Sequence, residues 1–325
     1  VLKVHRAIIG KMTLQDAEGR SSVEVSDGSE IRSLAVSPDV AFKAIGNETR
    51  IAILDTLWGP QKSGTMGFAE LRKAVGMRDG SQFNFHLRKL VGGGFIEKVD
   101  DAYTLRQAGA RVICTLRTGY LTDHPEIDEF ETTGRCYACD APLNARYEDE
   151  MYHVACSACD RLHARGWFPP NVLVGRTAEE ALLVGEAAMR ASIDLTVAGI
   201  CSVCNGTPVR TLSRGLSDVP VESQTPLDEE RDGGIRAFYV CGRCSAWVTR
   251  SPGDAVTDHP AVVALYTDHG IDIRACPRWE LPWTIDPSVT EVVSKDPFRV
   301  RLVVECEGEN RVLTLDDAFD VVSVE

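Results

Sequence analysis

The stretch that decides the fold is SQFNFHLRKLVGGGFIEKVDDAYTLR, residues 81–106. In its first part, apolar residues recur at the spacing of one helix face, at Phe83, Leu87 and Leu90. Three glycines at 92–94 stop this helix. Apolar and polar residues then alternate around an Asp100–Asp101 turn, which predicts a short β-hairpin. A helix followed at once by a two-stranded hairpin is therefore expected.

Further helices are predicted on both sides of this stretch. Apolar residues recur at helical spacing in SPDVAFKAIGNETRIAILDTLW, residues 37–58, with a break at Gly46–Asn47 that divides two helices. GPQKSGT at 59–65 is expected to be a loop, FAELRKAVG at 68–76 a short helix, and QAGARVICTLRTGYL at 107–121 a last helix. This order of helices with a two-stranded wing predicts a winged helix-turn-helix domain.

Two strings in this region carry a family resemblance. AIGNETRIAILDTL and SQFNFHLRKLVGGGFIEK resemble the ArsR-like winged-helix regulators of the haloarchaeal type, whose patterns are ALxxxTRxxILxxL and SxxxxHLxxLxxxGxI. The resemblance covers about residues 39–121 and implies a dimeric transcriptional regulator. His86 matches the family's histidine and is expected to orient the helix rather than read bases. FAELRKAVGM lacks the cysteine motif of arsenic-sensing members, which puts arsenite sensing at that place in doubt.

The helix that starts at Ser81 is the expected recognition helix, with its N-terminal half in the major groove. If the apolar stripe faces inward, five side chains project outward: Ser81, Gln82, Asn84, Phe85 and Arg88. Asparagine and glutamine can pair with adenine, and arginine can read guanine or contact phosphate. Contacts to the DNA backbone are expected from Lys98, Tyr103 and Arg106, on or beside the wing.

The charge is unevenly distributed along the chain. The 325 residues carry a net charge of −13, which by itself argues against nucleic-acid binding. However, residues 35–121 sum to +4 and residues 122–325 to −17. The cationic segment is thus the one with the winged-helix pattern. The 27 arginines against 8 lysines fit both a salt-rich cytoplasm and a high-GC genome.

Eight of the 11 cysteines form four CxxC pairs in two blocks. The first block, C-x2-C-x16-C-x2-C, contains Cys136, Cys139, Cys156 and Cys159. The second block, C-x2-C-x36-C-x2-C, contains Cys201, Cys204, Cys241 and Cys244. Four thiolates at such spacing predict a structural zinc ribbon in each block, hence two zinc ions (Zn2+) per chain. Four protein ligands leave no open coordination position on the ion, which argues against catalysis there. Iron–sulfur or redox use of the CxxC pairs is the less favoured alternative.

The surroundings of the blocks give further expectations. Each of the four CxxC pairs can form a tight turn, called a knuckle below. Residues suited to such turns follow the four pairs: Asp140, Asp160, Asn205 and Ser245. Trp167 and Trp247 are expected to cover the sites, and His163 to be packed or solvated rather than a ligand. The polar stretch 213–234 predicts a flexible excursion. Among the leftover cysteines, Cys114 is expected in a helix core.

An α+β chain of five parts is predicted. Residues 1–34 are expected to be a mobile arm, 35–121 the winged helix-turn-helix domain with its dimerisation helix, 122–175 the first zinc ribbon, 176–275 a helix with the second ribbon, and 276–325 a β-meander. No apolar run approaches the ~18–20 residues of a membrane span. The apolar start lacks a small-residue cleavage site. A cytoplasmic protein without membrane contact is therefore expected.

These patterns favour a transcription regulator that binds double-stranded DNA as a homodimer. The dimer is expected through the helix 107–121, which carries Val112, Ile113, Leu116, Tyr120 and Leu121, with help from the acidic C-terminal half. The alternative is an adaptor whose ribbons bind the transcription machinery. An enzyme is disfavoured, because no nucleophile–base pair can be placed. Trp279 and Trp283 are expected as core anchors, with a small-molecule effector pocket beside them as the alternative.

Overall fold

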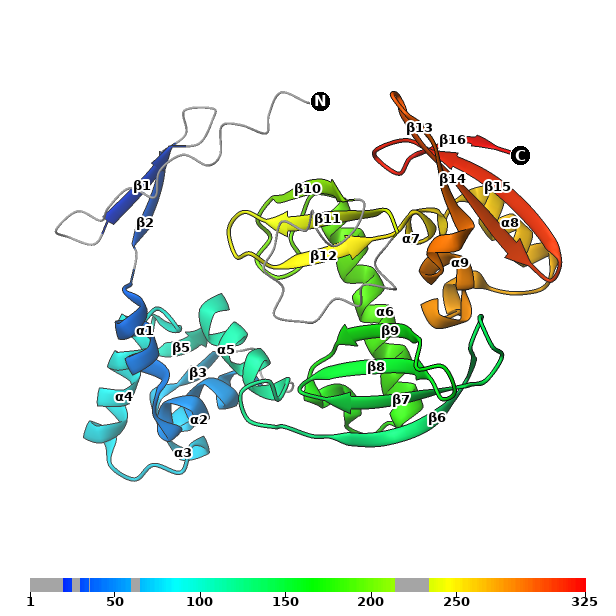
Figure 1. The fold of residues 1–325 in the computed structure, drawn as a ribbon. Coiled ribbons are helices and arrows are strands. Elements are labelled where there is room, and N and C mark those ends of the chain that lie inside the picture. Colours follow the sequence, from blue (N-terminus) through cyan, green and yellow to red (C-terminus); the bar gives the residue numbers. More distant parts are fainter. Residues whose placement is uncertain (1–19, 25–29, 35, 60–64, 214–233) are drawn as a thin grey trace. The chain divides into compact units, whose positions relative to one another are not determined.

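The computed structural model describes residues 20–24, 30–34, 36–59, 65–213 and 234–325 (Figure 1). The chain divides into two compact units, Val1–Thr122 and Asp123–Glu325. Most of the predicted arm and of the predicted excursion lies outside the described residues. Within the arm, β1 (Arg20–Glu24) and β2 (Glu30–Leu34) form an antiparallel pair where no regular structure was expected.

In the rest of the first unit, the described residues form five helices and a small sheet (Figure 1). The helices are α1 (Pro38–Ile45), α2 (Glu48–Leu57), α3 (Phe68–Ala74), α4 (Gly80–Gly92) and α5 (Gln107–Arg117). The strands β3 (Thr65–Gly67), β4 (Ile96–Val99) and β5 (Ala102–Leu105) pair antiparallel in the order β3-β5-β4. Every helix predicted in this region is present, and the third strand is additional, because β3 begins at the end of the expected loop.

The start of α4 differs from the prediction by one residue. The Asp79 carboxylate accepts hydrogen bonds from the amides of Ser81 and Gln82 at 2.7 and 3.1 Å. Asp79 is therefore the N-cap and Gly80 the first helical residue, because the Asp79 carboxylate satisfies amides that have no partner within the helix. The predicted apolar stripe is confirmed, since Phe83, Leu87 and Leu90 are each 0% exposed.

The second unit starts with two antiparallel sheets that contact one long helix. The first sheet contains β6 (Ile127–Arg135), β7 (Pro142–Glu148), β8 (Met151–Cys156) and β9 (Leu162–Trp167) in chain order. After a 3-10 turn, η1 (Pro170–Leu173), comes the long helix α6 (Ala178–Val197). The second sheet contains β10 (Pro208–Ser213), β11 (Arg236–Cys241) and β12 (Trp247–Arg250). At the start of α6, Thr177 and Glu180 form a reciprocal capping box.

The C-terminal part combines short helices with a meander. Two helices, α7 (Pro252–Val256) and α8 (Pro260–Asp268), are followed by the 3-10 turns η3 (Ile273–Ala275) and η4 (Arg278–Glu280). The helix α9 (Pro282–Ile285) and the 3-10 turn η5 (Pro287–Val289) come next. The strands β13 (Thr290–Lys295), β14 (Phe298–Cys306), β15 (Glu309–Leu315) and β16 (Val321–Val324) follow in chain order. The predicted meander is therefore present, although the helical turns delay its start to Thr290.

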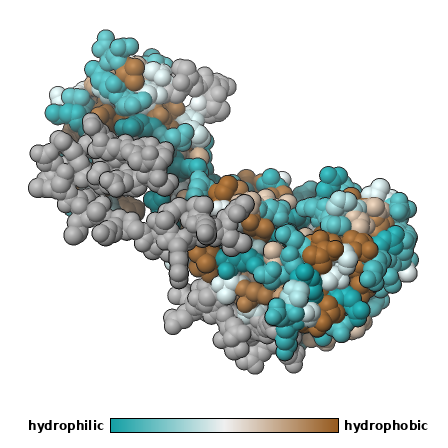
Figure 2. All heavy atoms as spheres, turned by 90° about the horizontal axis from the view of Figure 1, so that it is seen from above, coloured by the Kyte–Doolittle hydropathy of each residue, from teal (hydrophilic) through white to brown (hydrophobic). Residues whose placement is uncertain are grey.

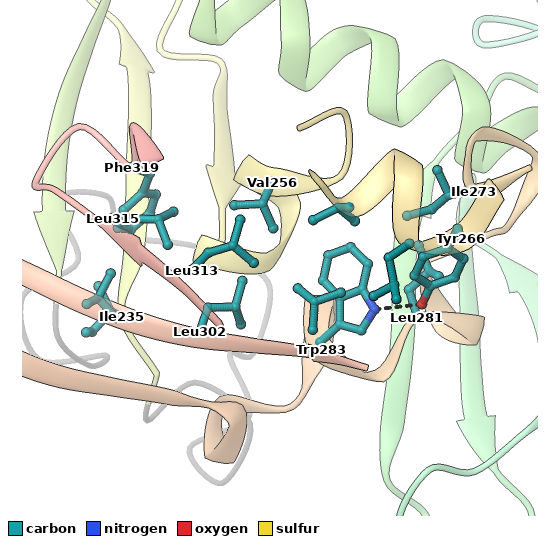
Figure 3. Packing of buried hydrophobic residues seen from close by; sticks show 14 of the residues in the cluster. Ile235, Val256, Tyr266, Ile273, Leu281, Trp283, Leu302, Leu313, Leu315 and Phe319 are labelled. Carbon is teal, nitrogen blue, oxygen red and sulfur yellow. Dashed lines mark hydrogen bonds between the residues drawn. The ribbon is translucent and has the colours of Figure 1, made fainter. Parts of the chain in front are cut away.

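The meander and the short helices share a core (Figure 3). Leu302, Leu313 and Leu315 are each 0% exposed. Trp283 is 3% exposed, and its indole nitrogen donates a hydrogen bond to the Tyr266 hydroxyl at 2.8 Å. Trp283 is thus a core anchor with its polar atom satisfied. In the part of the chain that the structure describes, no helix combines the length and apolarity needed to cross a bilayer.

Candidate metal centres and candidate nucleic-acid interface

Each predicted block of cysteines closes into one cluster. In Cys136, Cys139, Cys156 and Cys159, and again in Cys201, Cys204, Cys241 and Cys244, the four sulfur atoms lie within 4.8 Å of one another. The closest pairs are Cys139–Cys156 at 3.4 Å and Cys204–Cys241 at 3.5 Å, and all eight are free thiols. Four sulfurs at such distances can surround a single ion. Both groups are therefore positioned to bind a metal ion.

The four CxxC knuckles share one backbone geometry. In each, the amide of the first cysteine donates to the carbonyl five residues later, as from Cys136 to Ala141 at 2.9 Å and from Cys201 to Gly206 at 2.8 Å. The residue after the second cysteine has positive φ, at Asp140, Asp160, Asn205 and Ser245. These are the predicted turn residues, and Asn and Asp tolerate the left-handed region better than most side chains. The local sequence therefore favours the same backbone turn at all four CxxC pairs.

Backbone amides stabilise thiolates in both clusters. The Cys156 sulfur accepts hydrogen bonds from the amides of Ala158 and Cys159, each at 3.4 Å. Burial raises the pKa of Cys156, but these amides and the neighbouring thiols outweigh it and lower the pKa to about 6. Cys241 has the same arrangement, with the Arg243 amide at 3.4 Å and a pKa lowered to about 6. A thiolate at neutral pH is the form that binds a metal ion.

Two aromatic expectations about the first cluster have different outcomes. His163 is 0% exposed and packs against the Tyr137 ring with centroids 5.1 Å apart, so it is packed as expected. Trp167 pairs with Met151, at the opposite end of β8 from Cys156. It packs edge-to-face against Trp247, with the ring centroids 6.1 Å apart, instead of covering the cluster. The prediction for Trp167 was therefore wrong, because the register of β8 and β9 decides where it lies.

The predicted DNA-contacting residues of α4 share one exposed face. Ser81, Gln82, Asn84, Phe85 and Arg88 are all exposed, whereas His86 is buried with the apolar stripe. Burial, followed by the charge of Arg50, lowers the pKa of His86. The predicted direction of each side chain follows from the helical period, which the structure reproduces.

Of the three residues predicted to contact DNA from the β4–β5 hairpin or beside it, two are exposed and one is buried. Lys98 and Arg106 are exposed, and the Lys98 ammonium lies 4.0 Å from Asp101. Tyr103 is 7% exposed, because β5 is the central strand and its Met66 partner on β3 is also in the core. The expectation that Tyr103 contacts DNA is corrected accordingly.

Cys114 of α5 is exposed, so the expectation that it lies in a helix core was wrong.

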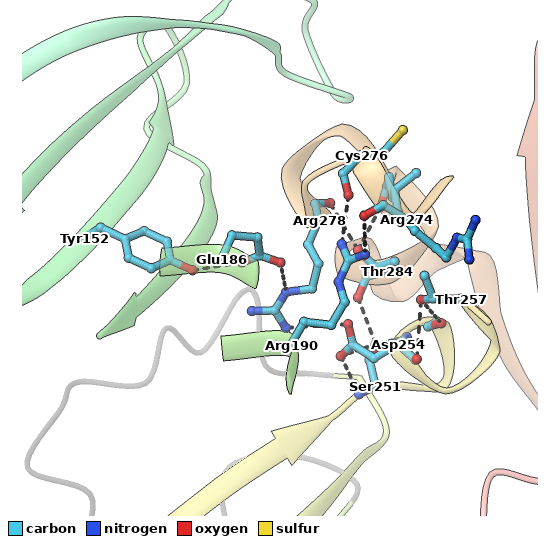
Figure 4. A network of polar contacts seen from close by, with 12 residues as sticks. Tyr152, Glu186, Arg190, Ser251, Asp254, Thr257, Arg274, Cys276, Arg278 and Thr284 are labelled. Carbon is cyan, nitrogen blue, oxygen red and sulfur yellow. Dashed lines mark hydrogen bonds and ion pairs between the residues drawn. The ribbon is translucent and has the colours of Figure 1, made fainter. Parts of the chain in front are cut away.

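A buried ionic network in the second unit had no counterpart in the sequence analysis (Figure 4). The Glu186 carboxylate accepts hydrogen bonds from the Tyr152 hydroxyl and from Arg278 Nε, each at 2.8 Å. Arg278 also lies 3.5 Å from Asp254. Burial opposes the charge of Arg278, but the two carboxylates outweigh it and raise its pKa. The network joins β8, α6, α7 and η4 within one unit.

The chain also matches two protein families. Residues 38–116 match the family described as "Domain of unknown function (DUF7347)". Residues 133–321 match the family described as "Domain of unknown function (DUF7351)". No curated protein and no solved structure matches the chain. Since the second match spans more than half of the chain, the protein belongs to the family described as "Domain of unknown function (DUF7351)".

Proposed function

We propose that the protein is a sequence-specific DNA-binding transcription regulator, whose first unit is a winged helix-turn-helix domain of the ArsR-like kind. The observation that carries this proposal is the exposed face of α4. It presents Asn84, Arg88 and Lys89 to solvent, while its opposite side is fully buried. Amide and guanidinium groups on one helix face are the groups that read base edges in the major groove.

The elements around α4 support the same assignment. α3 and α4 are joined by a short turn and followed by the β4–β5 hairpin, the expected wing. Exposed cations lie on these elements at Lys73, Arg78 and Lys98, and directly after the hairpin at Arg106. Arg78, in the turn before α4, and Lys89 were not among the predicted residues, although the charge of segment 35–121 points to them. Such cations attract the phosphate backbone.

We further propose that each cysteine cluster holds one structural zinc ion. Sulfur–zinc bonds of about 2.3 Å place tetrahedral sulfurs ~3.8 Å apart. The separations of 3.8 Å for Cys136–Cys159 and 3.7 Å for Cys201–Cys244 match this edge length, and the closest pairs, at 3.4 and 3.5 Å, are somewhat shorter. Bound zinc would join the two knuckles of each ribbon, and thiolate-stabilising amides favour that role.

We also propose that the protein is a homodimer, but with fewer contacts from α5 than the sequence predicted. Ile113 of α5 is buried in its own unit and Val112 and Leu116 are half-buried, which leaves Tyr120 and Leu121 exposed at 38% and 66%. This is less apolar surface than the sequence predicted. The acidic half therefore has to contribute more of the contact.

α6 has a suitable exposed face for that contribution. Val184, Ala188, Ala191 and Leu195 are exposed and follow one another at spacings of four, three and four residues. This spacing forms a continuous stripe along a helix. The stripe is symmetric about its midpoint, so two antiparallel copies would place Val184 against Leu195 and bring the alanines together at the centre. A twofold interface needs this self-complementarity.

The test is direct binding of the full chain to DNA. Ligands selected from random duplexes should share a motif, and Arg88→Ala should weaken binding to it by about ten- to a hundredfold, the cost of one good base contact. Arg301→Ala, an exposed arginine of the acidic unit, is the matched control and should leave affinity unchanged. Failure to enrich any sequence would refute the proposal.

An adaptor of the transcription machinery is the second candidate. It is favoured by apolar side chains on the ribbons, where Val203 is 73%, Val209 52% and Trp167 41% exposed. Figure 2 shows hydrophobic residues dispersed among hydrophilic ones on the face of the second unit that it presents. Binding of a polymerase or general factor without DNA, lost in Val203→Asp, would support this candidate.

A further inference from the structure

The outermost line of α4 carries an aromatic ring. Phe83, Leu87 and Leu90 define the buried side of the helix. Ser81, Phe85 and Arg88 follow one another at spacings of four and three residues on the opposite side and are exposed. If α4 enters a groove with its buried side outward, these side chains reach deepest. Phe85 is the middle one of the three.

The Phe85 ring belongs to the surface rather than to the core. It is 47% exposed, whereas the core positions of the same helix are 0% exposed. The Lys89 ammonium lies 5.6 Å from its centroid, and the buried His86 ring packs edge-on at 5.6 Å. These neighbours restrain the ring, while the exposed side chains beside it are polar at Ser81, Asn84 and Arg88.

The major groove offers one apolar group to such a ring. Base edges present donors and acceptors, and the 5-methyl group of thymine is the apolar exception. We infer that Phe85 packs against the 5-methyl group of a thymine in each half-site. This inference rests on the proposed function. It makes Phe85 a specificity-determining residue, between the polar side chains of Asn84 and Arg88 that read neighbouring bases.

The experiment removes only the methyl group. In the selected operator, each thymine is replaced in turn by deoxyuridine, which keeps the base pairing, and the affinity of the full chain is measured. At one thymine in each half-site, the replacement should weaken binding about fourfold, because burying one methyl-sized group contributes ~0.8 kcal/mol and 1.36 kcal/mol corresponds to tenfold. Phe85→Ala should bind the thymine and deoxyuridine operators equally.

Two controls separate this contact from other losses. Arg301→Ala, the exposed control position of the second unit, should retain the preference for thymine over deoxyuridine. Phe85→Leu, which keeps an apolar side chain, should retain part of it. Equal binding of both operators by the unchanged protein, or an undiminished preference in Phe85→Ala, would overturn the inference and leave the proposed function standing. Absence of any sequence-selective DNA binding would overturn both.

Discussion

Arg278 Nε donates a hydrogen bond to the Glu186 carboxylate at 2.8 Å, and the two side chains are only 19% and 3% exposed. The residues lie 92 positions apart in the chain. Tyr152 and Asp254 complete the charged and polar contacts around them (Figure 4). Because the pair is taken out of water, each charge depends on the other, and β8 of the first sheet is thereby fixed to α6 and η4.

Glu186→Gln is expected to destabilise the second unit substantially. The amide keeps the shape of the side chain but leaves the buried guanidinium with Asp254 as its remaining carboxylate. Removing one partner of a buried pair costs about 3–5 kcal/mol, and we expect the lower end because Asp254 stays. Urea denaturation of the full chain measures this loss.

An exposed ion pair provides the control for this loss. Arg301 and Glu291 are 2.6 Å apart but 50% and 63% exposed. Glu291→Gln should therefore cost less than about 1 kcal/mol. Equal losses of unfolding free energy in the two variants would show that burial does not make the Glu186–Arg278 pair more important for stability than the exposed pair.

Metal analysis of the purified chain should find two zinc ions. Cys136→Ser and Cys201→Ser should each reduce the count to one and unfold the affected ribbon, because a hydroxyl replaces a thiolate ligand. Cys114→Ser changes an exposed cysteine outside both clusters and should leave two ions. Iron in place of zinc, or an unchanged count in the cluster variants, would contradict the prediction.

Asn84→Ala and Lys98→Ala should have different effects on DNA binding. Loss of a base contact at Asn84 should lower affinity for the selected operator by about 1–3 kcal/mol with little effect on other sequences. Loss of a phosphate contact at Lys98 should weaken all sequences equally and reduce the salt slope by ~0.9. Salt titrations on specific and random duplexes distinguish the two effects. Identical behaviour of both variants would contradict the assignment of α4 as the reading helix.

The features that sequence could predict have local causes. The turn at Asp140, the capping box of Thr177 and Glu180, and the buried stripe of α4 each depend on residues within a few positions. The environments of Tyr103 and Glu186 could not be predicted in this way, because they depend on segments that are distant in the sequence. Whether Tyr103 faces the core depends on pairing with β3, a strand of three residues that is too short to show a period. Glu186 looks like an ordinary surface residue of a helix until Arg278 is brought to it by the fold.

His86 should make the stability of the first unit depend on pH. Its pKa is lowered from 6.5, first by burial and then by Arg50. The folded state therefore binds a proton less readily than the unfolded state. The contribution of His86 to stability should be constant above about pH 6.5 and should fall below it, until the pH reaches the lower pKa of the folded state.

The check is thermal denaturation of the full chain at pH 7.5 and 5.5, which lie roughly one unit above and below the ordinary histidine pKa. His86→Gln cannot titrate, so it should lose less stability than the unchanged chain between these conditions. His153 also has a pKa lowered by burial and is present in both proteins, so the difference isolates His86. An identical loss in both would exclude His86 as the source.

Leu195→Glu should weaken the proposed dimer. Leu195 is 39% exposed at one end of the α6 stripe, and in an antiparallel pair it would lie against Val184 of a second copy. A carboxylate there would be buried in the interface at both symmetric positions, without a basic partner on the stripe. Val174→Glu introduces the same charge at an apolar position that is 76% exposed and lies outside α6. Light scattering at micromolar concentration should therefore give a dimer for the unchanged chain and for Val174→Glu, and a shift toward monomer for Leu195→Glu. A dimer that survives Leu195→Glu but dissociates in Leu121→Glu would place the contact on the segment after α5, near the helix that the sequence predicted. A monomer for the unchanged chain, Val174→Glu and Leu195→Glu alike would remove the basis for a palindromic operator.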